Sequence, residues 1–521
     1  MNCKHTMKKH SQYMQIQRPD APTTLARSVL IIMITVATVF HGLNAFAQNA
    51  SAQISQYLPF DMPSTSDLRA SPHKVFSHYF TPFPISIDNK DPSVDYYTGG
   101  YLSPTGEGDK HISYGGFFRE RPLPRSPIPA ANWAFLDAET DVRRAVAIGL
   151  DGFTVDLFPS QLNRVEQLMN AAQAVDPGFK LVLMPDMDGS KDVRALTKVV
   201  QTLAAYPSCY RLADGRVVVA PYDAQEKSVD WWRDWLSAMK TNGINIAFVP
   251  LFQNWSKYAA AYAPISYGFS DWGDRAAIDN AGPAWLNAAS RAHQYVPVWM
   301  HPVAAQDARP YCQRYWEAEN TGTLRNTWEL GAIGKADWVQ LITWNDYSEE
   351  AEISPSTGIQ YLYYDLNAYY ICWFKMGFPP PIVRDCIYYC HRMESVNTLP
   401  DPAKQTAGPL RLTGGIASDK IEAVVFLTAD ATLEIEINGV KKDFPVSAPR
   451  SIIDIPLQQG QPIFRLIRNG QTVAAVQSAF PINNQITYQD LLYHGGSSLR
   501  PPVTQVPNAY YPHNLTPGSS P

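Results

Sequence analysis

The chain has 521 residues, 45% of them hydrophobic and only 17% charged, which excludes a disordered protein and allows one large domain and a smaller one. The formal net charge is −5. Because the chain is acidic and has no basic tract beyond its N-terminal region, we expect neither nucleic acid nor a membrane as a stable partner.

The N-terminus has the pattern of a signal peptide. Five Lys and Arg residues precede the apolar run Val29–Phe40 (VLIIMITVATVF), and an A-x-A cleavage pattern follows at Ala45–Ala47. The run is too short to span a bilayer comfortably, although an uncleaved anchor is the alternative. We therefore expect cleavage of residues 1–47 after Ala47 and a secreted or periplasmic location. The remaining chain would carry a net charge of −9.

Five cysteines remain after residue 47: Cys209, Cys312, Cys372, Cys386 and Cys390. An odd number leaves at least one free thiol. Cys386 and Cys390 have the spacing of one helical turn, in which a direct disulfide is awkward, and His391 is adjacent. We expect these cysteines to be buried or structural, with a metal site as the minor alternative.

Residues 48–69 are polar and are expected to form a flexible linker. Over residues 70–400, short apolar runs alternate with helix-like stretches such as Gln161–Val175, Val193–Ala204 and Val229–Asn242, which favours a parallel sheet. Eight runs over about 300 residues fit a (β/α)8 TIM barrel better than an open doubly wound sheet. No GxGxxG or P-loop motif follows any run. The runs are Val75–Tyr79, Gly152–Leu157, Leu181–Pro185, Val217–Pro221, Ile246–Pro250, Ile265–Phe269, Val296–Met300 and Trp338–Ile342.

In such a barrel the active site lies at the carboxyl ends of the strands. Strand ends must meet solvent in any barrel, so part of their polarity is expected by chance. The strand ends combine several carboxylates with Trp, Tyr and His and have no nucleophilic Ser or Cys motif. Chance explains this combination less well. The strand-end residues are His78, Tyr79, Asp156, Asp186, Asp188, Tyr222, Asp223, Gln253, Asn254, Asp271, Trp272, His301, Asp346 and Glu349.

From about residue 408 the pattern changes to alternating polar and apolar residues separated by turn signals. Residues 408–482 are expected to form a small all-β sandwich domain. Its expected strands are Ile421–Leu427, Ala431–Ile437, Ser451–Pro456, Ile463–Arg468 and Gln471–Val476. Residues 495–521 are rich in Pro, Gly and Ser and are expected to be a disordered tail.

The strand-end motifs resemble those of glycoside hydrolase family 71, the α-1,3-glucanases also called mutanases, and the chain is similar to a remote, bacterial-type member. DWVQLITWNDYSEE (Asp337–Glu350) contains the most specific motif, which departs from the family at Ser348, where Gly is usual, and after Glu349. FRLIRNGQTV (Phe464–Val473) is similar to the family's terminal β-domain. The other motifs are KVFSHYF (Lys74–Phe80), AIGLDGFTVDL (Ala147–Leu157), FKLVLMPDMD (Phe179–Asp188), FVPLFQNW (Phe248–Trp255) and GFSDWGD (Gly268–Asp274).

Cleavage of a glycosidic bond needs a protonated acid at the leaving oxygen and a carboxylate that activates water or attacks directly. Asp346 and Glu349 are the best pair, because a helical turn would point both the same way. The resemblance implies that this Asp-x-x-Glu pair catalyses hydrolysis with inversion. We assign Glu349 as the general acid and Asp346 as the base, although the two roles could be exchanged. Glu350 is expected to be a solvated loop acid.

The resemblance also implies roles in sugar binding. His78 and Tyr79 resemble a His-aromatic pair that would line the −1 sugar site, and Asp186 would hydrogen-bond sugar hydroxyls. A structural role is as plausible for Asp186 and Asp156 as a functional one. Aromatic faces pack against pyranose rings, so the stacking candidates are Tyr222, Trp272 and Trp344, with His301 as a weaker binding candidate.

The leading hypothesis is an exported glycoside hydrolase that cuts α-1,3-glucan or a related polysaccharide, without a metal or organic cofactor. A second hypothesis keeps the barrel and changes the substrate, as in an endo-α-mannosidase-like or other α-glycan hydrolase. A third is a non-catalytic carbohydrate-binding surface protein, against which the presence of both Asp346 and Glu349 argues.

Overall fold

The computed structural model describes residues 54–187 and 192–501. The expected signal peptide, residues 1–47, lies outside these residues. In the part of the chain that is described, no helix is both long and apolar enough to cross a membrane.

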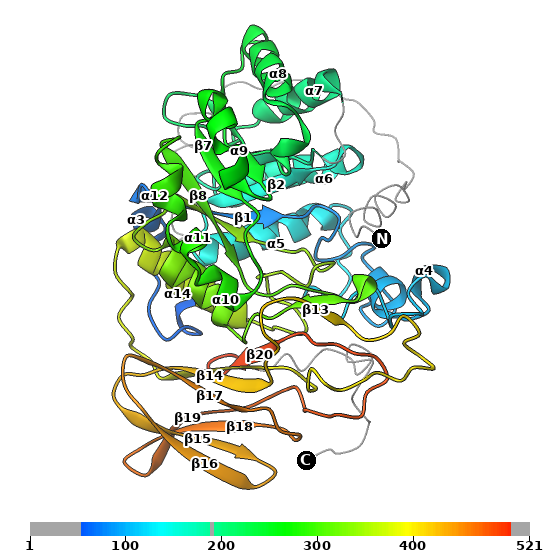
Figure 1. Ribbon diagram of the computed structural model, residues 1–521, viewed down its shortest axis with the longest axis vertical. Helices are drawn as coiled ribbons and strands as arrows, with labels where there is room; N and C mark the ends of the chain where they lie inside the picture. The colour runs from blue at the N-terminus through cyan, green and yellow to red at the C-terminus, as the bar shows by residue number, and fades with distance from the viewer. Residues whose placement is uncertain (1–53, 188–191, 502–521) are drawn as a thin grey trace.

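The larger part of the fold is a closed barrel of parallel strands with helices around it (Figure 1), as predicted. The strands follow the order β5-β4-β3-β2-β1-β11-β8-β7-β6. Only Val249 and Pro250 separate β5 from β6, so these two edges are one interrupted strand and the ring has eight strand positions. The strands are β1 Lys74–Tyr79, β2 Gly152–Leu157, β3 Lys180–Pro185, β4 Val217–Val219, β5 Ile246–Phe248, β6 Leu251–Phe252, β7 Gly268–Asp271, β8 Val298–Ala304 and β11 Trp338–Ile342.

Most outer helices lie where the sequence predicts them. Ser228 caps the N-terminus of α8, because its hydroxyl accepts a hydrogen bond from the Trp231 amide (3.2 Å). The main helices are α5 Trp133–Ala147, α6 Leu162–Val175, α7 Val193–Ala204, α8 Val229–Thr241, α9 Trp255–Tyr262, α12 Ala288–Ala292 and α14 Leu362–Met376. The short helices are α3 Thr65–Ala70, α4 Gly106–Asp109, α10 Ala277–Asn280, α11 Pro283–Leu286 and α13 Gly322–Arg325.

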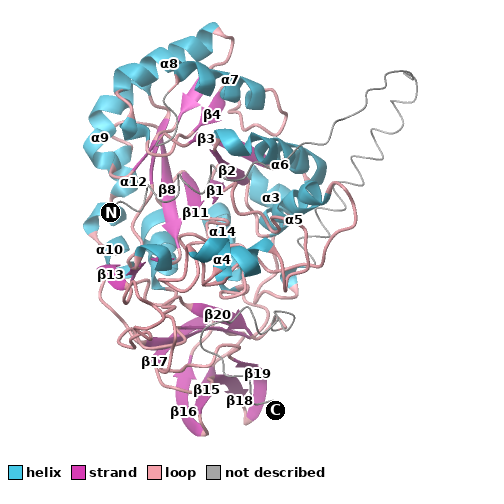
Figure 2. Ribbon diagram, turned by 90° about the vertical axis from the view of Figure 1, so that its right-hand side faces the viewer, coloured by secondary structure: helices cyan, strands magenta, loops and turns pink. Residues whose placement is uncertain are grey.

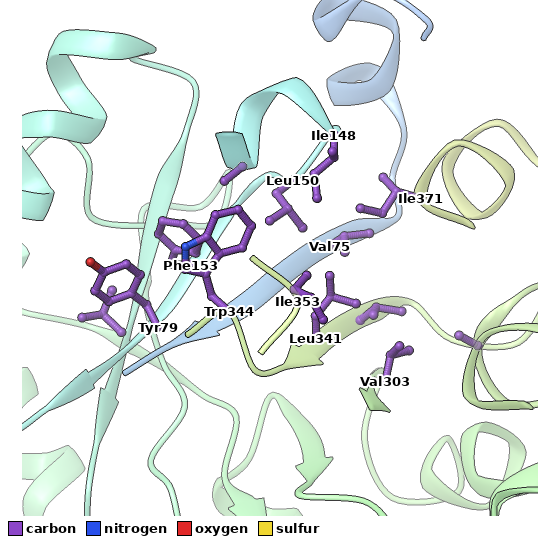
Figure 3. Close-up of a cluster of buried hydrophobic side chains, with 14 of the residues drawn as sticks. Val75, Tyr79, Ile148, Leu150, Phe153, Val303, Leu341, Trp344, Ile353 and Ile371 are labelled. Atoms are coloured by element: carbon purple, nitrogen blue, oxygen red, sulfur yellow. The ribbon is translucent and has the colours of Figure 1, made fainter. Parts of the chain in front are cut away.

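Alternate residues along each barrel strand face opposite sides of the wall. One set fills the inside of the ring and includes Phe76 and Met300. The other set packs against the helices and includes Val75, Phe153 and Val303 (Figure 3). This alternation decides which side chains can reach the mouth of the barrel.

Below the barrel lies a sandwich of two four-stranded antiparallel sheets (Figures 1 and 2). It contains all five predicted strands, but its limits differ from those expected. β12 comes from the part assigned to the barrel, and β20 lies at the start of the expected disordered tail. The sheets are β17-β14-β12-β20 and β16-β15-β18-β19, with β12 Cys386–His391, β14 Lys420–Phe426, β15 Ala431–Ile437, β16 Val440–Val446, β17 Arg450–Pro456, β18 Ile463–Arg468, β19 Gln471–Gln477 and β20 His494–Ser497. A small third sheet joins β9 Ala308–Arg309, β10 Arg314–Trp316 and β13 Arg411–Gly414.

Strand β12 joins the sandwich to the barrel, because both of its faces are buried. Tyr388 and the two cysteines, Cys386 and Cys390, belong to the barrel core. Ile387 and Tyr389 belong to the core between the two sheets. The helical spacing of the cysteines is thus a strand spacing that places both on one face, and each is a free, buried thiol.

The segment expected to be a flexible linker is packed against the barrel from residue 54 onward. Leu58 and Phe60 are fully buried, and the Pro59 carbonyl accepts hydrogen bonds from the amides of Val383 (2.8 Å) and Arg384 (3.0 Å). The overall composition of residues 48–69 is polar, so it did not reveal these two apolar residues. Their burial favours an ordered segment.

Candidate active site

Five of the predicted binding residues lie on the inward-facing side of the wall. His78 and Trp272 contact each other edge to face, with ring centroids 5.0 Å apart, and the Tyr222 ring lies 4.8 Å from Trp272. The backbone of Asp186 forms a bridge with that of Tyr222. Asp156 completes the set, with its Oδ2 3.6 Å from Nε2 of His78.

Three other predicted binding residues face the helices, so their assignment to the sugar site is wrong in this structure. Tyr79 and Trp344 both donate to the Asp141 carboxylate of α5, each over 3.1 Å, and lie in the outer core (Figure 3). His301 accepts a hydrogen bond from the Trp299 indole (3.1 Å) and is buried against Gly331. The period of two in a strand explains the error, because neighbours such as His78 and Tyr79 cannot both point inward.

The two proposed catalytic carboxylates lie on the loop after β11, and both are buried. Asp346 is held in place by its own loop. Its amide donates to the Thr343 hydroxyl (2.8 Å), and its Oδ1 accepts from the Ser348 amide (3.0 Å) and hydroxyl (2.6 Å). Glu349 follows in the turn over residues 347–350.

A second loop, after β8, reaches Glu349. Nη2 of Arg309 lies 3.0 Å from Oε2 of Glu349, an ion-pair distance. Both carboxylate oxygens of Asp307 accept hydrogen bonds from the same guanidinium, Oδ1 from Nε (2.8 Å) and Oδ2 from Nη2 (2.6 Å). Arg275 also lies near Asp307, with its Nε 3.5 Å from Oδ2 of Asp307. A bidentate grip fixes both position and orientation of the guanidinium.

The environment of the two carboxyl groups favours their protonated forms. Burial raises the pKa of Glu349 to about 7; Arg309 opposes the rise, and Asp307 and Asp346 add to it. Burial raises the pKa of Asp346 to about 6 against the hydrogen bonds from Ser348. A carboxyl group whose pKa lies near neutrality can give or take a proton at physiological pH, as acid–base chemistry requires.

His78 is neutral in this setting, because burial lowers its pKa to about 3 despite the nearby carboxylates Glu349 and Asp186. Burial also raises the pKa of Asp156 well above its usual range. In the described part of the chain, neither ring nitrogen of His78 has a hydrogen-bond partner. Oδ1 of Asp156 has no partner there either. These polar atoms are therefore available to a polar ligand, since buried polar groups are nearly always paired.

Four residues of the site were not among the predicted ones: Arg275, Asp307, Arg309 and Tyr311. Tyr311 lies near both carboxylates, and burial raises the pKa of its phenol well above the usual range. Asp307, Arg309 and Tyr311 belong to the QDARPYC stretch beyond β8, where the sequence gives no periodic signal. The charged pair Asp307 and Arg309 was the feature of this stretch that could have indicated a functional site.

Glu350, expected to be a solvated loop acid, is instead fully buried. Its backbone lies in the left-handed region (φ 47°). Its Oε1 accepts a hydrogen bond from the Arg119 amide in the long loop after β1.

The sequence pattern of Glycosyl hydrolase family 71 matches residues 128–494. The chain belongs to this family. Membership makes the protein a glycoside hydrolase and confirms the resemblance of its motifs. A glucan endo-1,3-alpha-glucosidase of Schizosaccharomyces pombe is 24% identical over 404 residues, which are 70% of this chain and 92% of the relative. A mutanase of Penicillium rubens is 24% identical over 395 residues, 70% of this chain and 85% of the relative.

Among solved structures, this family 71 chain is similar to the GH99 endo-alpha-mannosidase from Bacteroides thetaiotaomicron. The likeness has a TM-score of 0.46 and 15% sequence identity, and it covers 58% of this chain and 98% of the other.

Proposed function

We propose that this family 71 glycoside hydrolase cleaves α-1,3-glucan by an inverting mechanism in which Glu349 is the general acid and Asp346 the general base. The observation that carries the proposal is the pair of buried carboxyl groups on the β11 loop, whose pKa values are raised to about 7 and about 6. The substrate follows the curated relatives, whose names describe α-1,3-glucanases.

In the proposed reaction, a water molecule attacks the anomeric carbon while the bond from that carbon to the bridging oxygen breaks. Glu349 gives its proton to the departing oxygen, and Asp346 takes a proton from the water. Attack from the face opposite the leaving group turns an α-linked sugar into a β-configured product. These proton transfers need no metal or organic cofactor.

Each neighbouring group has a defined part in this scheme. Arg309 holds Glu349 in place through their ion pair at 3.0 Å. Trp272, inside the mouth, offers a face against which a pyranose ring packs, with Tyr222 beside it. His78, Asp156 and Asp186 face the same space and supply polar atoms for sugar hydroxyls.

The proposal includes export of the protein. A polysaccharide outside the cell is reached only by an exported enzyme, and the sequence before Ala47 has the pattern of a cleaved signal peptide. N-terminal sequencing of the exported protein is expected to begin at Gln48.

A panel of α-glycans tests the substrate. Insoluble α-1,3-glucan is expected to release reducing ends, whereas α-1,4-glucan, α-1,6-glucan and α-mannan are not. Proton NMR of the first product, recorded before mutarotation, is expected to show the β-anomer. Release from α-mannan alone would favour the mannosidase hypothesis. Binding to α-1,3-glucan with no product under any condition would favour a non-catalytic surface protein, and a first product in the α-configuration would contradict inversion.

A further inference from the structure

The loop after β7 carries a buried arginine beside the proposed catalytic pair. Arg275 is 4% exposed and closes a tight turn that starts at Asp271, the last residue of the strand. Oδ1 of Asp271 accepts a hydrogen bond from the amide of Gly273 (2.9 Å), whose backbone is left-handed (φ 78°). The turn brings the Arg275 side chain back over the Trp272 ring, with the guanidinium carbon 5.5 Å from the ring centroid.

Neighbouring groups hold the Arg275 guanidinium in one place. Its Nη1 donates to the Trp272 carbonyl (2.8 Å), and its Nε lies 3.5 Å from Oδ2 of Asp307. The backbone is fixed as well, because the Thr323 hydroxyl donates to the Arg275 carbonyl (2.9 Å). A side chain held in this way loses little further freedom when it binds a ligand.

Part of this guanidinium has unused hydrogen-bond donors. Among the described residues, no hydrogen-bond partner reaches Nε or Nη2 of Arg275. Both oxygens of the nearby Asp307 already accept from Arg309. Buried polar groups are nearly always paired, and a buried charge with unpaired donors is costly. An oxygen atom of a bound substrate is therefore a suitable acceptor for these donors.

The Arg275 guanidinium lies between the proposed general acid and the proposed sugar-binding rings. Burial raises the pKa of Glu349 and lowers that of His78, and the positive charge of Arg275 lowers both pKa values, which places it close to both groups. The rings of His78 and Trp272 are in contact, with centroids 5.0 Å apart. A sugar whose glycosidic oxygen reaches Glu349 would therefore lie beside Arg275.

We propose that Arg275 binds the sugar on the leaving-group side of the scissile bond, where its Nε and Nη2 donate to hydroxyl oxygens of the departing unit. The planar guanidinium presents these two donors in a fixed geometry that suits two neighbouring oxygens. Arginine also stays charged over the whole pH range in which Glu349 titrates, so its donors are always present. This assignment rests on the proposed function, because it takes Glu349 as the acid.

The two arginines of the site thus have different parts. Arg309 forms an ion pair with Glu349 at 3.0 Å and acts through it, whatever the leaving group is. Arg275 contacts the departing sugar, so its contribution depends on the presence of that sugar. Two substrates that differ only in their leaving group therefore separate the two roles.

The test measures Arg275→Lys, which keeps the charge and loses the planar fork, on an α-linked oligosaccharide and on an α-glycosyl fluoride with the same sugar units. In the fluoride, water attacks the anomeric carbon, the C–F bond breaks, and fluoride leaves with the electron pair, so no sugar departs. On the oligosaccharide, kcat/KM is expected to fall by about 10–100-fold, as when a hydrogen bond to a charged group is lost. On the fluoride, kcat/KM is expected to stay close to that of the unaltered chain.

Equal losses on the two substrates, or a shift of the basic limb of the pH profile, would show that Arg275 acts through Glu349 and would overturn the assignment. An unchanged rate on the oligosaccharide would overturn it as well. Arg291→Lys is the matched control, because this exposed arginine lies 5.2 Å from the Trp255 ring on an outer helix, and it is expected to keep both rates. If Arg275→Lys fails to fold, Arg275→Gln replaces it with the same expectation.

The choice of oligosaccharide keeps this test separate from that of the proposed function. Its linkage is the one that the unaltered chain cleaves in the panel of α-glycans. Cleavage of a linkage other than α-1,3 would overturn the proposed glucanase function, whereas the comparison of the two leaving groups would still decide the role of Arg275.

Discussion

Nη2 of Arg309 lies 3.0 Å from Oε2 of Glu349, while Asp307 holds the same guanidinium with two hydrogen bonds. Three residues of the loop after β8 and the loop after β11 thus form one charged chain, Asp307–Arg309–Glu349. Burial favours a protonated Glu349 and Arg309 favours an ionised one, and the balance leaves the Glu349 pKa at about 7. In the proposed mechanism, this arrangement fixes the position of Glu349 as the general acid and sets the pKa at which it releases a proton.

Arg309→Lys tests this chain. Lysine keeps the positive charge but loses the planar fork that Asp307 grips, so Glu349 is no longer held in one geometry. We expect kcat to fall by roughly 10–100-fold, since small misplacements of catalytic groups cost rates of that order, with little change in KM. Arg314→Lys, at an exposed position on β10, is the matched control and is expected to leave kcat unchanged. An Arg309→Lys enzyme with normal kcat would show that the ion pair has no part in catalysis.

The pH profile tests the participation of Asp346. As the proposed base, Asp346 must be ionised, and burial raises its pKa to about 6. The value of kcat/KM is therefore expected to rise with pH through about 6, falling about tenfold per unit on the acidic side. A profile with no acidic limb near pH 6 would contradict the participation of Asp346.

Ser348→Ala should move that acidic limb. The Ser348 hydroxyl donates to Oδ1 of Asp346 over 2.6 Å and so stabilises its ionised form. Without this bond the pKa of Asp346 is expected to rise by about one unit, and the limb should shift to higher pH by the same amount. A limb that stays in place in the variant would mean that another group titrates there.

Substitutions of Trp272 and Trp344 are expected to differ in their effect on KM. Trp272→Ala should raise KM about tenfold, because stacking on a sugar contributes about 1 kcal/mol. It should also lower stability, because the ring is buried against His78 and Tyr222. Trp344→Phe should lower the free energy of unfolding by about 1–3 kcal/mol, since Asp141 loses a donor in the core, with KM unchanged. Initial rates on both variants decide; a raised KM for Trp344→Phe with an unchanged KM for Trp272→Ala would contradict the inward and outward placement.

A buried ion pair between α14 and the barrel allows a test of the fold. Nζ of Lys375 lies 2.7 Å from Oδ2 of Asp151, which also accepts from the Val75 amide (2.7 Å). Lys375→Met is expected to cost roughly 3–5 kcal/mol of stability, because it leaves a buried carboxylate without its cation. Adding Asp151→Asn should recover part of this loss. Lys442→Met, at an exposed position on β16, is the control and should change stability by less than about 0.5 kcal/mol.

Much of this structure was predictable from local patterns, because the barrel and the sandwich are built from periodic segments. The apolar runs gave the strands, and their carboxyl ends located Asp346 and Glu349. The patterns did not show which way the side chains point at the strand ends. Within one strand, however, side chains alternate in direction, so His78 and Tyr79 must point to opposite sides. Contacts between distant loops, such as Arg309 with Glu349, have no local signal at all, since tertiary packing alone creates them.

The β-domain shows a different limit of sequence patterns. Strand β12 reads as a short apolar run, CIYYCH, because both of its faces are buried, and such a run cannot be told from a helical segment by periodicity. The start of the expected disordered tail is ordered through Arg500, whose Nε donates to Oδ2 of Asp365 on α14 (2.8 Å). The Pro-, Gly- and Ser-rich composition of this segment does not reveal a single ordering contact of this kind.

The most direct test of the account is turnover of α-1,3-glucan by Asp346→Asn and Glu349→Gln. Both changes keep the shape of the side chain and remove its proton chemistry. We expect each variant to fold normally by circular dichroism and to lose kcat by roughly 10²–10⁴-fold or more. The matched control Asp454→Asn, in the β-sandwich, should keep full activity. Full turnover by either folded catalytic variant would contradict the assignment of the two carboxylates as acid and base.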